Sequence, residues 1–151
     1  VPARVSNDVA KRATAIAEKI VNDLNVVGTL AVEMFLLEDG TIYVNELAPR
    51  PHNSGHYTIE ACETSQFEQH IRAVCGLPLG PTTLRSAVVM ENILGEQLEG
   101  VLASLARLSD VKLHLYGKAE ARPKRKMGHL TAIGQTVEEA QEKLDRFKKR
   151  K

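Results

Sequence analysis

The sequence has no tryptophan, only two cysteines and few aromatic residues of any kind, which make up 4% of its 151 residues. Cys62 and Cys75 lack the spacing of a zinc site, and we expect both to be buried free thiols, as in a reducing compartment. No apolar run approaches the roughly 20 residues that a membrane-spanning helix needs. The 20 basic and 19 acidic residues give a net charge of +1, which excludes a global attraction to nucleic acid or membranes.

Two nucleotide-binding motifs are also missing. The chain contains neither the glycine-rich phosphate loop nor the dinucleotide-binding fingerprint. It starts at Val1 without a signal peptide, so we expect it to begin partway into a longer protein. The 43% hydrophobic and 26% charged residues are typical of a globular chain, and this length suffices for one domain or for parts of two.

Hydrophobic periodicity predicts both helices and strands in the chain. Ser6 or Asn7 can cap the first helix, and the pair Asp39-Gly40 indicates a tight hairpin turn. The sequence pattern changes after Gly95, and we therefore expect two parts, residues 1–95 and residues 96–151. The expected elements are helices over 8–23, 58–63, 66–75 and 98–108, strands over 28–37, 41–46, 84–95, 111–117 and 129–133, and a last helix that Thr136 caps.

The predicted hairpin carries two carboxylates, Glu33 and Glu46. Each lies six residues from the turn pair, so we expect them to face each other across the two strands. Their neighbours are apolar, and we therefore expect a partly buried face on which two like charges need a cation between them. Oxygen ligands favour Mg²⁺ or Mn²⁺ over zinc. The alternative is that both carboxylates lie on a solvated face of the sheet.

A polar loop follows the second predicted strand. Pro49 and Pro51 stiffen it, which lowers the entropy cost of presenting side chains. Arginine, histidine and asparagine donors beside a metal are suited to binding anions. The alternative is an ordinary polar surface loop. The candidate donors are Arg50, His52, Asn53, Ser54 and His56.

A second group of charges lies in a basic loop over 118–128. Such a loop near Tyr116 and His129 is suited to holding a phosphate. A solvated loop is the alternative, and contact with RNA is disfavoured because aromatic residues are not interleaved with the charges. The basic residues of this loop are Lys118, Arg122, Lys124, Arg125 and Lys126.

Two segments together resemble a known family. VEMFLLEDGTIYVNELAPRPHNSGHYTIEAC (32–62) and YGKAEARPKRKMGHLT (116–131) are similar to the N5-carboxyaminoimidazole ribonucleotide synthetases, which are ATP-grasp enzymes of purine biosynthesis. The resemblance covers essentially the whole chain in the family's order. It implies an α+β fold, in which the C-terminal half of an ATP-grasp domain is followed by a small α/β C-terminal domain.

The resemblance also implies a reaction and its site. The family activates bicarbonate with ATP to carboxyphosphate and transfers the carboxyl group to aminoimidazole ribonucleotide. By resemblance, Glu33 and Glu46 hold Mg²⁺ against ATP, and Asn45 lies beside them. By resemblance again, Arg50, His52 and Asn53 line the bicarbonate and aminoimidazole end, and Lys118 and Arg125 hold the ribonucleotide phosphate.

The family's N-terminal domain and the first half of its ATP-grasp domain have no counterpart in this sequence. We therefore expect the chain to be a section of the enzyme that is inactive alone, with the rest of its parent chain as a partner and a homodimer as a further arrangement. Cytoplasm, or a plastid for a plant parent, is the expected compartment. The competing hypothesis is a binding module for phosphorylated ligands or RNA that performs no chemistry.

Overall fold

The computed structural model describes residue 1 and residues 3–149. Within that part of the chain, contacts divide the molecule into two compact units. We call residues 3–59 and 63–83 the hairpin unit, and residues 1, 60–62 and 84–149 the three-stranded unit. Each unit is described by itself below.

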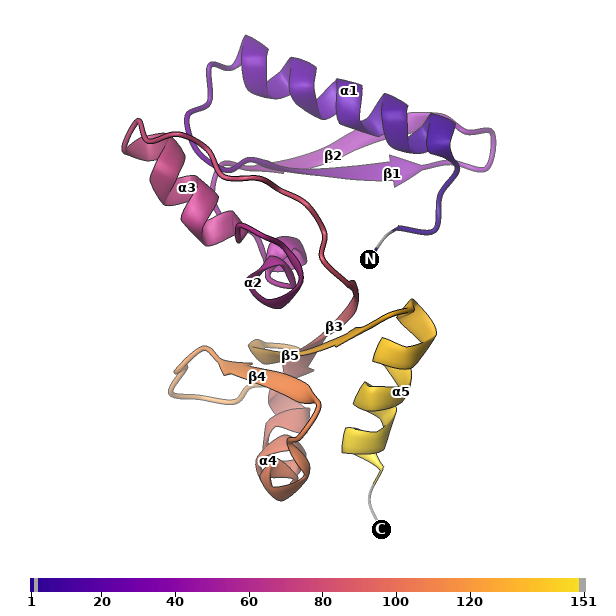
Figure 1. Cartoon of the computed structure of the whole chain (residues 1–151), viewed down its shortest axis with the longest axis vertical. Helices are drawn as coiled ribbons and strands as arrows, with labels where there is room; N and C mark the ends of the chain where they lie inside the picture. Colours follow the sequence, from indigo (N-terminus) through magenta and orange to yellow (C-terminus); the bar gives the residue numbers. More distant parts are fainter. Residues whose placement is uncertain (2, 150–151) are drawn as a thin grey trace. The chain divides into compact units, whose positions relative to one another are not determined.

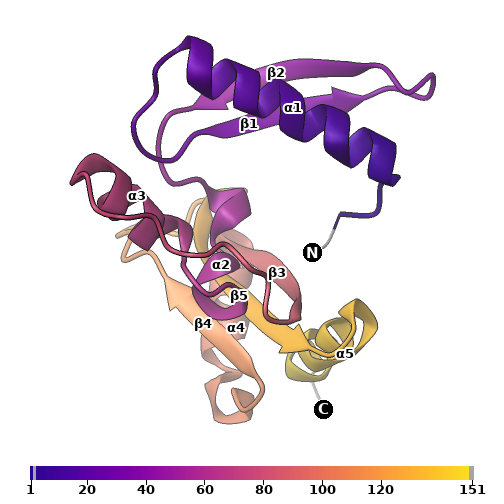
Figure 2. The ribbon, with the colours of Figure 1, turned by 45° about the horizontal axis from the view of Figure 1, so that its top comes forward.

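The hairpin unit contains a two-stranded antiparallel sheet with a long helix along it. Its elements are α1 (Asn7–Asp23), β1 (Ala31–Leu36), β2 (Ile42–Ala48), the first half of the short α2 (Thr58–Ala61) and α3 (Gln66–Val74). Ser6 caps α1, because its hydroxyl accepts a hydrogen bond from the backbone N–H of Val9. Figures 1 and 2 both show α1 running along the β1–β2 hairpin, so that one face of the sheet is turned away from the helix.

The three-stranded unit contains an antiparallel sheet in the order β3-β5-β4. Its core lies between this sheet and the C-terminal helix. Leu144 and Ile93 are large aliphatic side chains of this core, and each is at most 1% exposed. Thr136 caps the helix as expected, because its hydroxyl accepts from the N–H of Glu139. The elements are β3 (Ala87–Leu94), α4 (Leu98–Leu102), β4 (Val111–Leu115), β5 (Lys126–Gly134) and α5 (Val137–Lys148).

Strand β3 corrects the expected boundary at Gly95. It pairs along its whole length with β5, from Ala87 opposite Gly134 to Leu94 opposite Lys126. A strand cannot be separated from the ladder that satisfies its backbone hydrogen bonds, so the second unit begins before β3, at residue 84. A short piece of the earlier sequence, residues 60–62, also belongs to it, through the bridge between Cys62 and Leu84.

The two cysteines differ from expectation in one respect. Both are free thiols, but Cys75 is exposed at the end of α3, whereas Cys62 is partly buried. Burial raises the pKa of the Cys62 thiol, which keeps it in its less reactive protonated form. None of the helices in the described part of the chain is long and apolar enough to cross a bilayer.

Candidate functional site

Glu33 and Glu46 are direct partners across the β1–β2 hairpin, as the sequence predicts. The route to that pairing differs from the prediction. The backbone N–H of Leu37 donates to the carbonyl of Thr41 at 2.9 Å, which leaves a three-residue loop instead of a two-residue turn. Gly40 adopts φ of +81° there, a conformation that other residues rarely accept.

A bulge restores the predicted pairing. The three-residue loop pairs Met34 with Val44, and an unbroken ladder would then pair Glu33 with Asn45. The register shifts between Glu33 and Met34, so that Asn45 becomes the extra residue and Glu33 meets Glu46. Residues 44 and 46 would share a face in a regular strand, so the bulge is also what moves Glu46 to the face of Glu33.

This face is exposed, which corrects the expectation of partial burial. The Glu33 side chain retains 45% of its accessible surface, and Glu46 is exposed as well. The next pair on the same face, Phe35 and Tyr43, is 57% and 58% exposed although both side chains are aromatic. Burial of the charges therefore does not force a cation between the two carboxylates. Their oxygen donors and their opposition nevertheless fit a hard divalent cation.

His52 completes the cluster with a defined orientation. Its Nδ1 accepts from the backbone N–H of Ser54 at 3.4 Å and lies 2.9 Å from the Ser54 hydroxyl. A neutral imidazole that accepts at Nδ1 carries its proton on Nε2, and Nε2 lies 3.5 Å from Oε1 of Glu33. One ligand atom from each of Glu33, Glu46 and His52 lies within 4.8 Å of the others. In this tautomer His52 donates toward Glu33 instead of binding a metal.

Gln66, at the start of α3, holds the loop that carries His52. Its Oε1 accepts from the N–H of His52 at 2.9 Å, and its Nε2 lies 2.7 Å from the carbonyl of His52 and 2.8 Å from Nδ1 of His56. Gly55 leaves room for this contact, because a Cβ there would lie 2.6 Å from Oε1 of Gln66. Sequence reasoning missed Gln66, since nothing local marks a helical glutamine as the anchor of a loop 14 residues earlier.

The structure places the other predicted loop residues beside His52. Arg50 is exposed, and its guanidinium donates to the carbonyl of Pro51 at 3.1 Å. Asn53 is partly buried and begins a short 3₁₀ turn (Asn53–Gly55). Arg50, His52 and Asn53 therefore lie within four residues at the end of β2, the strand that carries Glu46.

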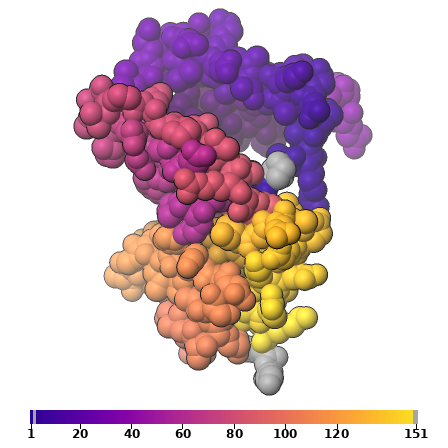
Figure 3. Space-filling view, viewed as in Figure 1, coloured from indigo at the N-terminus to yellow at the C-terminus, as the bar shows by residue number. Residues whose placement is uncertain are grey.

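Lys118 and Arg125 lie in the exposed loop between β4 and β5, in the three-stranded unit. Figure 3 shows the surface around residue 120 in orange. Lys118 Nζ donates to the carbonyl of Lys126 at 2.6 Å and lies 5.7 Å from the centre of the Tyr116 ring. Arg125 donates to the carbonyl of Glu120 at 3.1 Å. The charged groups of both side chains thus donate to backbone carbonyls, one within the loop and one at the first residue of β5.

Gly95 and Glu96 anchor this basic loop, and sequence reasoning missed both. A Cβ on Gly95 would lie 2.0 Å from the carbonyl oxygen of Arg122, so only glycine permits the close approach. The Glu96 carboxylate accepts from the N–H of Lys124 at 2.9 Å. Hydrogen bonds from the N–H groups of Glu96 itself and of Lys124 lower the pKa of the Glu96 carboxyl. The sequence signal that could have identified these two residues is a glycine followed by an acidic residue at the end of the predicted strand.

Comparison with known proteins decides the family. Residues 1–67 match the ATP-grasp domain, and residues 88–143 match the phosphoribosylaminoimidazole carboxylase C-terminal domain. The N5-carboxyaminoimidazole ribonucleotide synthase of Bacillus subtilis is 56% identical over 139 residues, which are 92% of this chain and 37% of that protein. The chain belongs to the N5-carboxyaminoimidazole ribonucleotide synthetase family.

Solved structures of this family have the same fold. The ADP complex of one N5-carboxyaminoimidazole ribonucleotide synthetase matches with a TM-score of 0.91 at 58% identity, over 97% of this chain and 39% of that chain. The synthase of Aspergillus clavatus in complex with ADP and 5-aminoimidazole ribonucleotide matches with a TM-score of 0.83 at 39% identity, over 96% and 41%. The predicted α+β fold, an ATP-grasp part followed by a small C-terminal domain, is confirmed. The chain spans about two fifths of these relatives' lengths.

Proposed function

We propose that this chain supplies the metal-binding and substrate-binding part of an ATP-dependent synthetase that converts 5-aminoimidazole ribonucleotide and bicarbonate into N5-carboxyaminoimidazole ribonucleotide. The observation that carries the proposal is the opposition of Glu33 and Glu46, with the donor loop 50–53 directly after β2. Two relatives of the same fold support it, one described as an ADP complex and the other as a complex with ADP and 5-aminoimidazole ribonucleotide.

In this proposal Glu33 and Glu46 hold Mg²⁺, with Mn²⁺ as a substitute, and Asn45 contributes to the nucleotide site from the bulge beside them. When bound, this ion would neutralise the negative charge of the ATP phosphates. Glu33 and Glu46 are direct partners across the two strands. Such a pair suits Mg²⁺, which keeps several water ligands and takes only one or two carboxylates from the protein. Nε2 of His52 lies 3.5 Å from Oε1 of Glu33, at the edge of this carboxylate pair.

Residues 50–53, the donor loop, take part in the transfer of the carboxyl group. The guanidinium of Arg50 is a planar fork that matches a carboxylate or bicarbonate. We propose that Arg50, His52 and Asn53 bind bicarbonate and the aminoimidazole, and stabilise the charge that develops during transfer. The contacts of Gln66 fix the loop before substrate arrives, which lowers the entropy cost of binding.

The basic loop acts on the ribonucleotide. Lys118 and Arg125 are exposed. The ammonium of Lys118 donates to the carbonyl of Lys126, and the guanidinium of Arg125 donates to the carbonyl of Glu120. A phosphate dianion is a stronger acceptor than a carbonyl, so it can displace those contacts. We propose that these two cations bind the 5′-phosphate of 5-aminoimidazole ribonucleotide.

The rest of the parent chain is the expected partner of the hairpin face. Phe35 and Tyr43 stay more than half exposed on the same face as the two carboxylates, an arrangement typical of a surface that another segment covers. Because the chain spans about two fifths of its relatives, we expect these 151 residues alone to show no ATP hydrolysis that depends on 5-aminoimidazole ribonucleotide. A homodimer, and the cytoplasm or a plant plastid, stay predictions.

The test replaces both carboxylates in a complete synthetase that contains this chain. The double variant Glu33→Gln and Glu46→Gln should lower kcat by at least about 100-fold, because the site loses its charge while its volume is kept. Glu38→Gln is the matched control, since Glu38 lies exposed in the loop of the same hairpin. Unchanged turnover in the double variant would refute the metal assignment. Ligand binding that depends on the basic loop alone and falls steeply with salt would favour the binding-module alternative.

A further inference from the structure

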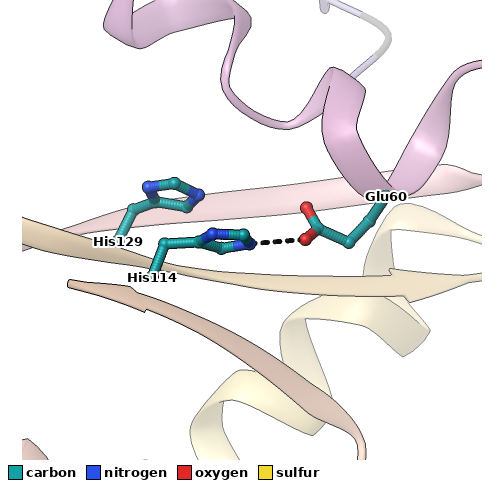
Figure 4. A group of neighbouring side chains, drawn as sticks. All are labelled: Glu60, His114 and His129. Carbon is teal, nitrogen blue, oxygen red and sulfur yellow. Dashed lines mark hydrogen bonds and ion pairs between the residues drawn. The ribbon is translucent and has the colours of Figure 1, made fainter. Parts of the chain in front are cut away.

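A second group of ligand-type side chains lies in the three-stranded unit. Glu60 extends from α2, His114 from β4 and His129 from β5, and all three belong to this one unit. Figure 4 shows the two imidazole rings one above the other, with the Glu60 carboxylate at their edge. They occupy the side of the sheet away from the α5 core, because Leu113 and Leu130, their neighbours on β4 and β5, pack on the core side.

The strand pairing brings the two histidines together. His114 is the direct partner of His129 across β4 and β5. Their rings stack with centroids 4.5 Å apart and planes 13° apart. His114 Nε2 lies 2.6 Å from Oε1 of Glu60. One ligand atom from each residue lies within 4.8 Å of the others.

Burial makes this cluster costly without a partner of opposite charge. His129 is 1% exposed, and the Glu60 side chain is 12% exposed. The second carboxylate oxygen of Glu60, Oε2, is buried and has no hydrogen-bond partner in the described part of the chain. A buried carboxylate oxygen without a hydrogen-bond partner is destabilising, because it has lost its hydration without compensation. A cation in the cluster would satisfy it.

We propose that Glu60, His114 and His129 bind a divalent transition-metal ion of the zinc type. Two imidazoles and one carboxylate are the ligands of open zinc sites, in which water takes the fourth position. His114 is one-third exposed, so solvent reaches that position. Mg²⁺ and Ca²⁺ prefer oxygen ligands and are disfavoured here. Tetrahedral ligands at about 2.0–2.1 Å lie about 3.3 Å apart, so side-chain movements on the order of 1 Å close the site.

Tyr116 positions one of the proposed ligands. Its hydroxyl lies 2.8 Å from Nδ1 of His129. Metal-binding histidines generally use their second nitrogen for a hydrogen bond of this kind, which fixes the ring and its tautomer. With Nδ1–H donating to Tyr116, Nε2 of His129 is the ligand nitrogen. The site is independent of the proposed function, since Glu33 and Glu46 belong to the other unit.

Cobalt binding tests the proposal. In a background of Glu33→Gln and Glu46→Gln, which removes the other carboxylate pair, the chain should bind one Co²⁺ and develop the intense visible absorption of tetrahedral coordination. Zn²⁺ should displace it. His114→Gln and Glu60→Gln should each weaken Co²⁺ binding by more than tenfold. Both amides can keep the hydrogen bond between these positions, and circular dichroism would verify that the variants fold.

Two further variants sharpen the test. His70→Gln makes the same change in the hairpin unit, outside both clusters, and should leave the cobalt titration unchanged. Tyr116→Phe should weaken Co²⁺ binding about tenfold and alter its spectrum, as loss of a hydrogen bond to a ligand does. The proposal is overturned if the background chain gives no such absorption up to millimolar Co²⁺, or if His114→Gln binds Co²⁺ as tightly as the background chain.

Discussion

The hairpin unit and the three-stranded unit each bring histidine and glutamate together, but in opposite surroundings. Glu33 and Glu46 form an exposed carboxylate pair beside the half-buried His52, whereas Glu60, His114 and His129 form a largely buried cluster with two imidazoles. Because the two carboxylates are exposed, they destabilise the fold little when no ligand is bound. The buried cluster lies in the sheet itself, so its side chains contribute to stability whether or not an ion is bound.

The largest expected difference between the clusters is in stability. His129→Ala should lower the free energy of unfolding of the three-stranded unit by about 2–4 kcal/mol, because it opens a cavity and removes the hydrogen bond to Tyr116. Glu33→Ala, at the exposed carboxylate pair, should cost the hairpin unit less than about 1 kcal/mol. Urea unfolding followed by circular dichroism measures both. Equal losses in the two variants would contradict the contrast in burial.

A smaller effect is expected from the loop anchor in the hairpin unit. Gln66→Leu removes the hydrogen bonds to His52 and His56 and should cost about 1–3 kcal/mol locally. Amide hydrogen exchange should speed up over residues 50–57 and stay unchanged in β5. Gln69→Leu is the control, since Gln69 makes a similar pair of hydrogen bonds, but to Gly80. Unaltered exchange in the loop would show that the prolines alone hold it.

The smallest effect concerns acid stability, through one exposed carboxylate in each unit. The N–H of Thr41 lowers the pKa of Asp39, and hydrogen bonds from Lys143 and the N–H of Gln135 lower the pKa of Glu139. A lowered folded-state pKa stabilises the fold above the unfolded pKa, and this stability is lost as pH falls below about 4.

Asp39→Asn and Glu139→Gln should therefore each flatten the acid side of the stability curve of their own unit. The effects should be small and should shrink with added salt, because both carboxylates are exposed. Thermal unfolding at pH 3 to 7, at low and high salt, measures them. An acid dependence identical to that of the unaltered chain would mean that neither hydrogen bond persists in solution.

Sequence reasoning was most successful where the signals are local. Ser6, Thr136 and the alternation of the strands each act through residues a few positions away, and the helices and strands formed close to the expected ranges. The pairing of Glu33 with Glu46 was also correct, although two departures cancelled. The turn holds one residue more than predicted, and the bulge at Asn45 compensates for it.

The sequence by itself determined the helices and strands and, through two long motifs, the family and with it the α+β class. Only the tertiary structure decided that β3 belongs with β5, that the Glu33–Glu46 face is exposed, and that Gln66 and Gly95 hold the two loops. It alone also brought Glu60 to His114, 54 residues away. The reason is that caps, turns and periodicity depend on near neighbours, whereas burial and long-range pairing depend on which surfaces the folded chain brings into contact.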